Sequence, residues 1–242
     1  MFNIQKFVFV FCLLFFVKTA SADFGDCLSM FPNSKPPKVT QPTGEKSKTK
    51  ELCYSGFAVL YSSESKDPIF SVEKINATQL SGPHVRRTNN FHEEERLDPS
   101  ERATLDDYRG SSYDRGHMTP AEDQSYSEQN MEDSFSLANM IPQNANLNRG
   151  AWAKRVEKPT RQYTMRAKGD VFVFTGPYFS PDHKTIGTNK IWVPTVVWKF
   201  VYDSTTERGW GFWIPNTDDA RVGPPISYEE LVSRTGINFL NK

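Results

Sequence analysis

The chain has 242 residues, of which 37% are hydrophobic and 24% are charged, a balance typical of a folded domain rather than of a disordered chain. Its 29 Lys and Arg residues match its 29 Asp and Glu residues, which excludes a globally basic nucleic-acid-binding protein. A local basic surface is still available, because basic residues in the segment 149–168 far outnumber its single acid, Glu157. Such a surface could bind phosphate groups.

The first 22 residues have the pattern of a secretory signal peptide. Lys6 supplies the positive charge, residues 7–17 form an apolar run, and an Ala-Ser-Ala cleavage site precedes Asp23. A membrane anchor is the alternative, but the apolar run is shorter than a bilayer span requires. We therefore expect a secreted or periplasmic protein that has no membrane contact after cleavage. The remaining chain of about 220 residues is long enough for one domain with a sizeable core.

The expected export also predicts the state of the cysteines. Cys12 leaves with the signal peptide, and Cys27 and Cys53 remain as a pair in an oxidising compartment. We expect a disulfide between them, with two free buried thiols as the alternative. The bond would connect residues 23–52, an irregular N-terminal arm whose prolines prevent long helices, to the first strand of the domain.

The first half of that domain, which we place at residues 53–242, is predicted to contain strands and a long loop. β-Forming residues predict a strand over 53–61, and alternating apolar and polar residues predict a second strand over 69–75. Residues 81–112 are polar and lack apolar periodicity, which indicates a long loop of the kind that is often functional. Apolar residues on one face predict another strand over 134–141.

The second half combines helices with further strands. Residues 150–165 have helical periodicity, and a capping pattern at Ser227 predicts a C-terminal helix. Runs rich in β-forming residues predict strands over three segments, 171–174, 191–202 and 210–214. Many strands and few helices predict an α+β domain built around an antiparallel central sheet.

The segment Asp114-Arg115-Gly116-His117 is the most informative part of the chain. A neutral imidazole is the side chain best suited to accept a proton near neutral pH. A guanidinium beside it matches the geometry of two phosphate oxygens. The alternative role for Arg115 is a salt bridge, for which Asp114 is the nearest candidate. The segment therefore indicates chemistry on a phosphate group.

Four further segments follow this motif in order along the chain. They are Ala138-Asn139-Met140-Ile141-Pro142-Gln143, Leu147-Asn148-Arg149-Gly150-Ala151-Trp152, Val173-Phe174-Thr175-Gly176-Pro177, and Val193-Pro194-Thr195 with Lys199. Together with the segment from Tyr113 to Pro120, they resemble the DNA/RNA non-specific endonucleases of the ββα-metal type, over roughly residues 53–215. The resemblance implies a ββα-metal catalytic core within the antiparallel α+β fold.

The resemblance also implies roles for individual residues. His117 would be the general base, Arg115 would hold the scissile phosphate, and Asn148 would be the single protein ligand of Mg²⁺ or Mn²⁺. The family places another phosphate-binding arginine at Arg87, and a poor local match leaves Arg86 as the alternative. Asn148 could instead be a turn or helix-cap residue, as isolated asparagines often are.

Asn139 and Asp114 are expected to support the site by hydrogen bonds. One position departs from the family pattern, which has a glutamate eight residues after the metal-binding asparagine. This chain has Val156 there, and Glu157 follows one position later. On a regular helix one residue turns a side chain by about 100°. Glu157 would therefore face away from the metal unless a one-residue helical bulge restores its direction, and it stays a catalytic candidate.

We therefore predict an exported, Mg²⁺-dependent endonuclease that recognises the backbone of single- or double-stranded DNA and RNA. By family resemblance it would leave 5′-phosphate ends. Related nucleases pair, which leaves a homodimer open. The alternative function is that of a catalytically inactive relative that binds nucleic acid or a protein partner. A serine hydrolase is a third class, but the chain lacks the Gly-x-Ser-x-Gly motif.

Overall fold

A six-stranded antiparallel sheet forms the centre of the computed structural model, which describes residues 23–40 and 48–241. The strand order is β11-β10-β7-β4-β3-β2. The strands are β2 (Thr49–Cys53), β3 (Phe57–Ser62), β4 (Asp67–Ile75), β7 (Val171–Tyr178), β10 (Val196–Asp203) and β11 (Arg208–Pro215). The sheet confirms the predicted α+β fold class. The predicted signal segment, residues 1–22, lies outside the described residues.

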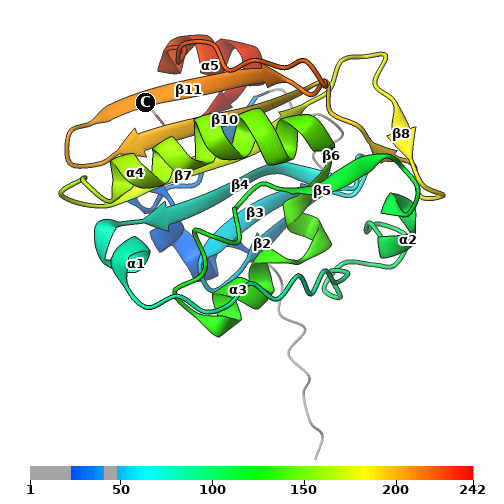
Figure 1. The fold of residues 1–242 in the computed structure, drawn as a ribbon, viewed down its shortest axis with the longest axis horizontal. Helices are drawn as coiled ribbons and strands as arrows, with labels where there is room; N and C mark the ends of the chain where they lie inside the picture. The colour runs from blue at the N-terminus through cyan, green and yellow to red at the C-terminus, as the bar shows by residue number, and fades with distance from the viewer. Residues whose placement is uncertain (1–22, 41–47, 242) are drawn as a thin grey trace, which may run out of the picture.

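Each face of the sheet is covered by other elements (Figure 1). One face carries the antiparallel pair of β5 (Tyr113–His117) and β6 (Met140–Asn144), followed by the π-helix η5 (Leu147–Glu157) and by α4 (Lys158–Thr164). The other face packs against η1 (Phe24–Met30) and α5 (Tyr228–Thr235). The remaining short elements are η2 (Pro32–Ser34), β1 (Lys38–Val39), α1 (Ala77–Ser81), α2 (Leu105–Tyr108), α3 (Glu128–Ser134), η4 (Leu137–Asn139), β8 (Thr185–Ile186), β9 (Ile191–Trp192) and β12 (Ile237–Asn238).

The period of two along the strands explains how both faces are buried. In β10, Trp198 and Phe200 pack in the core that contains Phe24, whereas Val197 packs in a second core with Trp152 of η5. Lys199 alternates onto the same face as Val197, and it is buried beneath η5 with its ammonium 5.6 Å from the Trp152 ring. The face under η5 therefore contains buried charge as well as apolar side chains.

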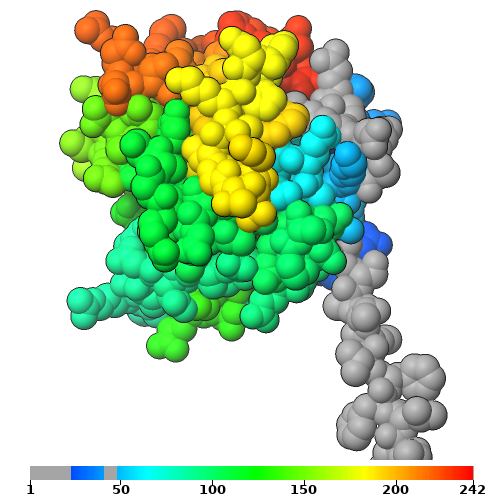
Figure 2. All heavy atoms as spheres, turned by 90° about the vertical axis from the view of Figure 1, so that its right-hand side faces the viewer, coloured from blue at the N-terminus to red at the C-terminus, as the bar shows by residue number. Residues whose placement is uncertain are grey.

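The segment that connects β7 to β10 carries β8 and β9 and lies beside the loop that contains α2. Figure 2 shows this segment in yellow, next to the green residues of the loop. Asn189 joins the two segments by donating hydrogen bonds from its backbone and its side chain to the carboxylate of Asp107, each at 2.9 Å. Across the part of the chain that the structure describes, none of the helices is long and apolar enough to cross a membrane.

Three strand predictions need correction. The predicted strand 53–61 is two strands, because a turn at 54–56 separates β2 from β3, with Tyr54 N donating to Phe57 O at 2.9 Å. The predicted strand 191–202 is interrupted at Pro194, which has no N–H to donate to a ladder. The segment 134–141 is the end of α3, then η4 and the start of β6, and the Ser136 side chain caps η4.

The N-terminal arm is more ordered than the sequence predicts. Phe24 and Phe31 are buried in the core, and Thr49–Cys53 adds an edge strand to the sheet. The predicted disulfide between Cys27 and Cys53 is present, with 5.8 Å between the two Cα atoms. The bond therefore joins η1 to the end of β2.

Replacing both cysteines (Cys27→Ser with Cys53→Ser) is expected to lower the free energy of unfolding by about 3 kcal/mol, because the bond restricts a loop of the unfolded chain. Its two ends are 26 residues apart in the sequence. Urea unfolding followed by tryptophan fluorescence would measure the loss, and the unmodified protein with dithiothreitol should lose a similar amount. A loss below about 0.5 kcal/mol would mean that packing of Phe24 and Phe31 holds the arm without the bond.

Candidate active site

β5, β6 and η5 bring the motif residues to one face of the sheet. In the β5–β6 register His117 lies opposite Met140 and Gly116 lies opposite Ile141. Gly116 also packs against Gln143, where an added Cβ would come within 2.2 Å of Gln143 Oε1. The motif therefore needs glycine at this position for β5 to approach its neighbour.

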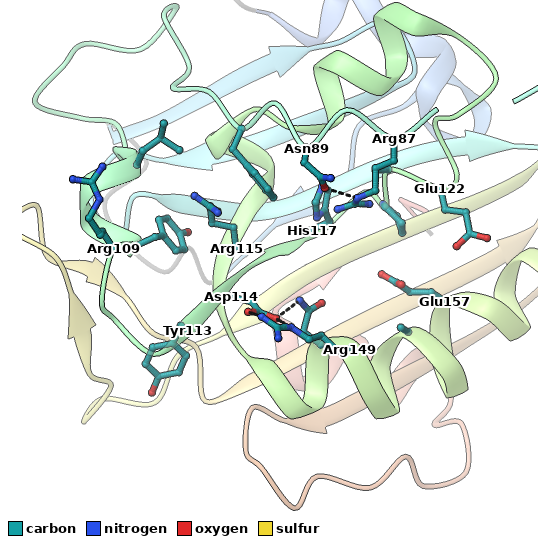
Figure 3. A pocket seen from close by; sticks show the side chains of 17 residues that line it. Arg87, Asn89, Arg109, Tyr113, Asp114, Arg115, His117, Glu122, Arg149 and Glu157 are labelled. Atoms are coloured by element: carbon teal, nitrogen blue, oxygen red, sulfur yellow. Dashed lines mark hydrogen bonds and ion pairs between the residues drawn. The ribbon is translucent and has the colours of Figure 1, made fainter. Parts of the chain in front are cut away.

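Six of the predicted residues line one pocket of about 820 Å³. They are Arg87, Asp114, Arg115, His117, Asn148 and Glu157. Figure 3 shows Arg115 and Arg87 on either side of His117, with Asp114 and Glu157 on the facing wall beside η5. Of the two arginines at 86 and 87, it is Arg87 that lines the pocket. The structure thus brings together residues from three separate segments of the sequence: the loop that contains Arg87, β5 and η5.

The His117 ring is packed between two aromatic rings. The ring centroids of Phe91 and Phe135 lie 5.6 and 5.1 Å from that of His117. Burial, together with the charges of Arg87 and Arg115, lowers the pKa of His117 to about 3. The imidazole is therefore neutral near pH 7, the form that can accept a proton.

Asp114 holds Asn148 in one orientation. The Asn148 side-chain Nδ2 donates to Asp114 Oδ2 at 2.9 Å, and Arg149 Nε donates to the same oxygen at 2.8 Å. Asn148 Oδ1 accepts no hydrogen bond from the residues that the structure describes. Because Asp114 is paired with Arg149, the alternative salt bridge between Asp114 and Arg115 does not form.

Asn139 does not line the pocket but fixes the chain that follows His117. Its Oδ1 accepts from the Thr119 backbone N–H at 2.9 Å, and its Nδ2 donates to the carbonyls of Thr119 and Ser134 at 2.9 and 3.0 Å. Asn139 is completely buried. These hydrogen bonds tie the segment after β5 to the segment before β6.

Glu157 lines the pocket because η5 is a π-helix. The backbone N–H of Lys158 donates to the carbonyl of Ala153, five residues earlier. Nine residues span about two and a half turns of a regular α-helix, which would put Asn148 and Glu157 on opposite faces. The wider π turn brings both into one pocket, while Val156 is buried in the core. The helical irregularity on which Glu157 depends is therefore present.

The pKa of Glu157 lies above the ordinary value of a glutamate, close to neutral pH. Burial is the main cause that raises the pKa of Glu157 to about 7; Asp123 acts in the same direction, and the charges of Lys199 and Arg161 oppose it. The basic residues of the segment 149–168 are themselves partly neutralised. Arg149 pairs with Asp114, and Arg161 pairs with Asp123 at 2.8 Å. Arg109, which also lines the pocket, pairs with Asp106 at 3.0 Å, so the arginines of the pocket without an ion pair to the described residues are Arg87 and Arg115.

The residues present fit a divalent cation held by one protein ligand. Among residues 23–40 and 48–241, no group of three or more His, Cys, Asp or Glu side chains could hold a metal ion. The Asn148 Oδ1 atom, however, is a neutral, hard oxygen that can bind a metal, and it accepts no hydrogen bond from the residues that the structure describes. Mg²⁺ suits such a site because it keeps several of its waters and also binds substrate phosphate oxygens.

Sequence reasoning missed Phe91 and Phe135. The Arg115 guanidinium lies 4.1 Å from the Phe91 ring centroid, and that of Arg87 lies 4.9 Å from the Phe135 centroid. No local signal could identify them, since both come from other segments and meet the arginines only in the folded chain.

Curated proteins with similar sequences are nucleases. Human mitochondrial endonuclease G is 35% identical over 153 residues, which cover 59% of this chain and 51% of that protein. The human mitochondrial nuclease EXOG is 30% identical over 163 residues, covering 63% and 44%. The mitochondrial nuclease of Saccharomyces cerevisiae is 37% identical over 127 residues, covering 52% and 38%. The matched part thus spans about half or less of each relative.

The expected secreted or periplasmic location is corrected by these relatives. The names of the animal and yeast proteins place them in mitochondria, which points to that compartment rather than to export. Charge, an apolar run and small residues at 1–22 suggested export, but they do not identify which membrane system such a segment addresses.

The fold and the sequence together identify the family. A crystal structure of the EndoG/EndoGI complex, described as showing the mechanism of EndoG inhibition, superposes with a TM-score of 0.72 at 26% identity, covering 79% of this chain and 85% of that one. The model of the DNA/RNA non-specific endonuclease family matches residues 36–242. The match includes every residue that lines the pocket. The chain therefore belongs to the DNA/RNA non-specific endonuclease family.

Proposed function

We propose that the chain is an endonuclease that hydrolyses phosphodiester bonds in DNA and RNA with Mg²⁺ (or Mn²⁺) as its cofactor. One observation supports this most directly: a neutral histidine, two arginines and a free amide oxygen line the same pocket. These groups are a proton acceptor, two phosphate ligands and a metal ligand, the parts that phosphodiester hydrolysis requires.

His117 accepts the proton of the attacking water. Arg115 and Arg87 bind the non-bridging oxygens of the scissile phosphate and offset the negative charge that grows during attack. Binding of the phosphate also offsets the positive charges that lower the pKa of His117. His117 therefore becomes a stronger base when substrate is bound than it is in the empty pocket.

Asn148 would hold the cation through Oδ1, and Asp114 orients the amide through its hydrogen bond with Nδ2. When bound, Mg²⁺ supplies charge stabilisation and acidic water at the leaving 3′ oxygen, which suits products with 5′-phosphate ends. Glu157 lies in the same pocket and would orient water molecules of the cation through its carboxylate.

Contacts to phosphate rather than to bases are the reason to expect both DNA and RNA as substrates. The printed sequence contains no zinc finger or RNA-recognition motif. The competing proposal is an inactive relative that binds nucleic acid without cutting it. It differs from the nuclease in turnover, not in binding.

Purified protein is expected to degrade both plasmid DNA and single-stranded RNA in Mg²⁺ and to stop when EDTA is added. Gel electrophoresis of timed samples would follow the loss of intact substrate, and excess Mg²⁺ should restore cleavage. Plasmid and RNA incubated in the same buffers without protein are the control for hydrolysis by the metal alone.

Either of two outcomes would overturn the proposal. Cleavage that continues in EDTA would exclude the role given to the cation. Binding of DNA without cleavage in any of Mg²⁺, Mn²⁺ or Ca²⁺ would favour the inactive relative instead.

A further inference from the structure

Two of the four arginines that line the pocket, Arg87 and Arg115, lie against aromatic rings and not against carboxylates, and Arg87 Nε also donates to Asn89 Oδ1 at 2.7 Å. The Arg115 guanidinium carbon lies 4.1 Å from the Phe91 ring centroid, and that of Arg87 lies 4.9 Å from the Phe135 centroid. Both distances are within the range of cation–π attraction. Within the described ranges of the chain, neither arginine forms an ion pair, and the guanidinium of Arg115 has no hydrogen bond.

The two phenyl rings form one unit with His117. Their centroids are 4.9 Å apart with the ring planes at 90°, an edge-to-face arrangement. Both rings also pack against the imidazole, at 5.6 and 5.1 Å. Phe135 is completely buried, so it anchors Phe91. The same pair of rings therefore contacts the base and both phosphate ligands.

The acidic side chains of the pocket leave these arginines unpaired. Asp114 is paired with Arg149, and Glu122 is paired with Arg161 at 2.7 Å. Glu122 and Glu157 act on Arg87 only through longer-range attraction. The positive charges of Arg87 and Arg115 consequently remain available inside the pocket, and both lower the pKa of His117.

A ring and a carboxylate hold an arginine with different consequences. A carboxylate occupies the N–H groups that a phosphate would use, and it cancels their charge before substrate arrives. A phenyl face attracts the flat guanidinium surface, keeps its direction and leaves the N–H edges free. An arginine oriented in this way loses less conformational freedom when it binds phosphate.

We propose that Phe91 and Phe135 are positioning residues that orient Arg115 and Arg87 toward the scissile phosphate without neutralising them. The inference rests on the proposed function, because it assumes that the two arginines meet a phosphate of nucleic acid. Neither ring needs to touch the reacting atoms. The rings act through the arginines.

A double-mutant cycle on the full chain separates this role from simple packing. The four proteins are wild type, Phe91→Leu, Arg115→Ala and the double variant. Fluorescence anisotropy with a labelled DNA duplex in EDTA gives Kd without cleavage, and cleavage in Mg²⁺ gives kcat/KM. We expect Phe91→Leu to weaken binding about 3- to 30-fold in the presence of Arg115 and less than about 2-fold in its absence.

Two further variants calibrate the cycle. Phe91→Tyr keeps the ring and should bind DNA within about 2-fold of wild type. Phe179→Leu removes a buried ring that packs edge-on against His183 and Trp192, at 5.9 and 5.4 Å, and does not line the pocket. Phe179→Leu should leave the Kd for DNA unchanged, because the ring that it removes lies outside the pocket.

The outcomes are distinct. Equal losses in both Arg115 backgrounds, or no loss in the wild-type background, would overturn the positioning role. A wild-type protein that binds DNA and shows the coupling but does not cleave would overturn the proposed function and leave this inference standing. If the protein cleaves DNA but the effects of Phe91→Leu and Arg115→Ala are not coupled, the proposed function stands and the positioning role is overturned. If the wild-type protein binds no DNA, both proposals are overturned.

Discussion

His117→Gln is expected to lower kcat for plasmid cleavage by about 10²- to 10⁴-fold, the usual contribution of a positioned general base. Glutamine is polar and of similar reach, but its amide cannot accept the proton of the attacking water. Arg87 and Arg115 remain in place, so Kd for DNA in EDTA should change little. Initial rates of supercoiled plasmid loss in Mg²⁺, beside anisotropy in EDTA, would separate the two quantities.

His183→Gln is a matched control for this variant. The centroid of the His183 ring lies 3.9 Å from that of Trp192, and His183 does not line the pocket, so its replacement should leave kcat within about 2-fold of wild type. His117→Ala gives a further check, since it opens a space between Phe91 and Phe135 that free imidazole could fill. Recovery of cleavage with added imidazole supports His117 as the base. Nearly normal kcat in His117→Gln would assign the base to another group.

Residues with local signals are the ones that the sequence predicts well. The strand predicted over 69–75 is part of β4 (Asp67–Ile75), and Ser227 caps α5 by accepting a hydrogen bond from Glu230 N at 3.1 Å. The motif at 114–117 and Asn148 of η5 lie in short segments whose residues carry the resemblance to the family. Their assembly in one pocket follows from the resemblance and from the order of β5, β6 and η5.

Features that depend on distant segments could not be predicted in the same way. Gly56 breaks the predicted strand 53–61, and an added Cβ there would lie 1.9 Å from Gln124 Oε1. The sequence shows a glycine but not the neighbour that makes it necessary. Phe91 and Phe135 are ordinary aromatic residues in sequence, and only the fold reveals which side chains they contact. Val156 of η5 likewise packs in a core with Val197 and Phe212, residues that are distant from it in the sequence.

Glu157→Gln is expected to lower kcat/KM in Mg²⁺ by about 10- to 100-fold, the range found when a group that orients a metal's ligands is lost. Glutamine keeps the size of the side chain and removes its charge. The Mg²⁺ concentration at half-maximal rate should rise, since the carboxylate would orient water molecules of the cation. Titration of cleavage rate against Mg²⁺ for both proteins would measure these changes.

Glu122→Gln provides the comparison, because Glu122 lines the same pocket and also acts on Arg87. Its side chain is 71% exposed and its carboxylate is paired with Arg161, so loss of the charge should change kcat/KM by less than about 3-fold. A larger loss of kcat/KM in Glu157→Gln than in Glu122→Gln would mean that the position of Glu157 on η5 matters, and not only the negative charge of the pocket. The π-helix would then serve to return a carboxylate displaced by one residue to the pocket. Equal and small effects would mean that Asn148 and water molecules suffice to hold the cation, and that the shape of η5 serves packing of Trp152 and Val156 alone.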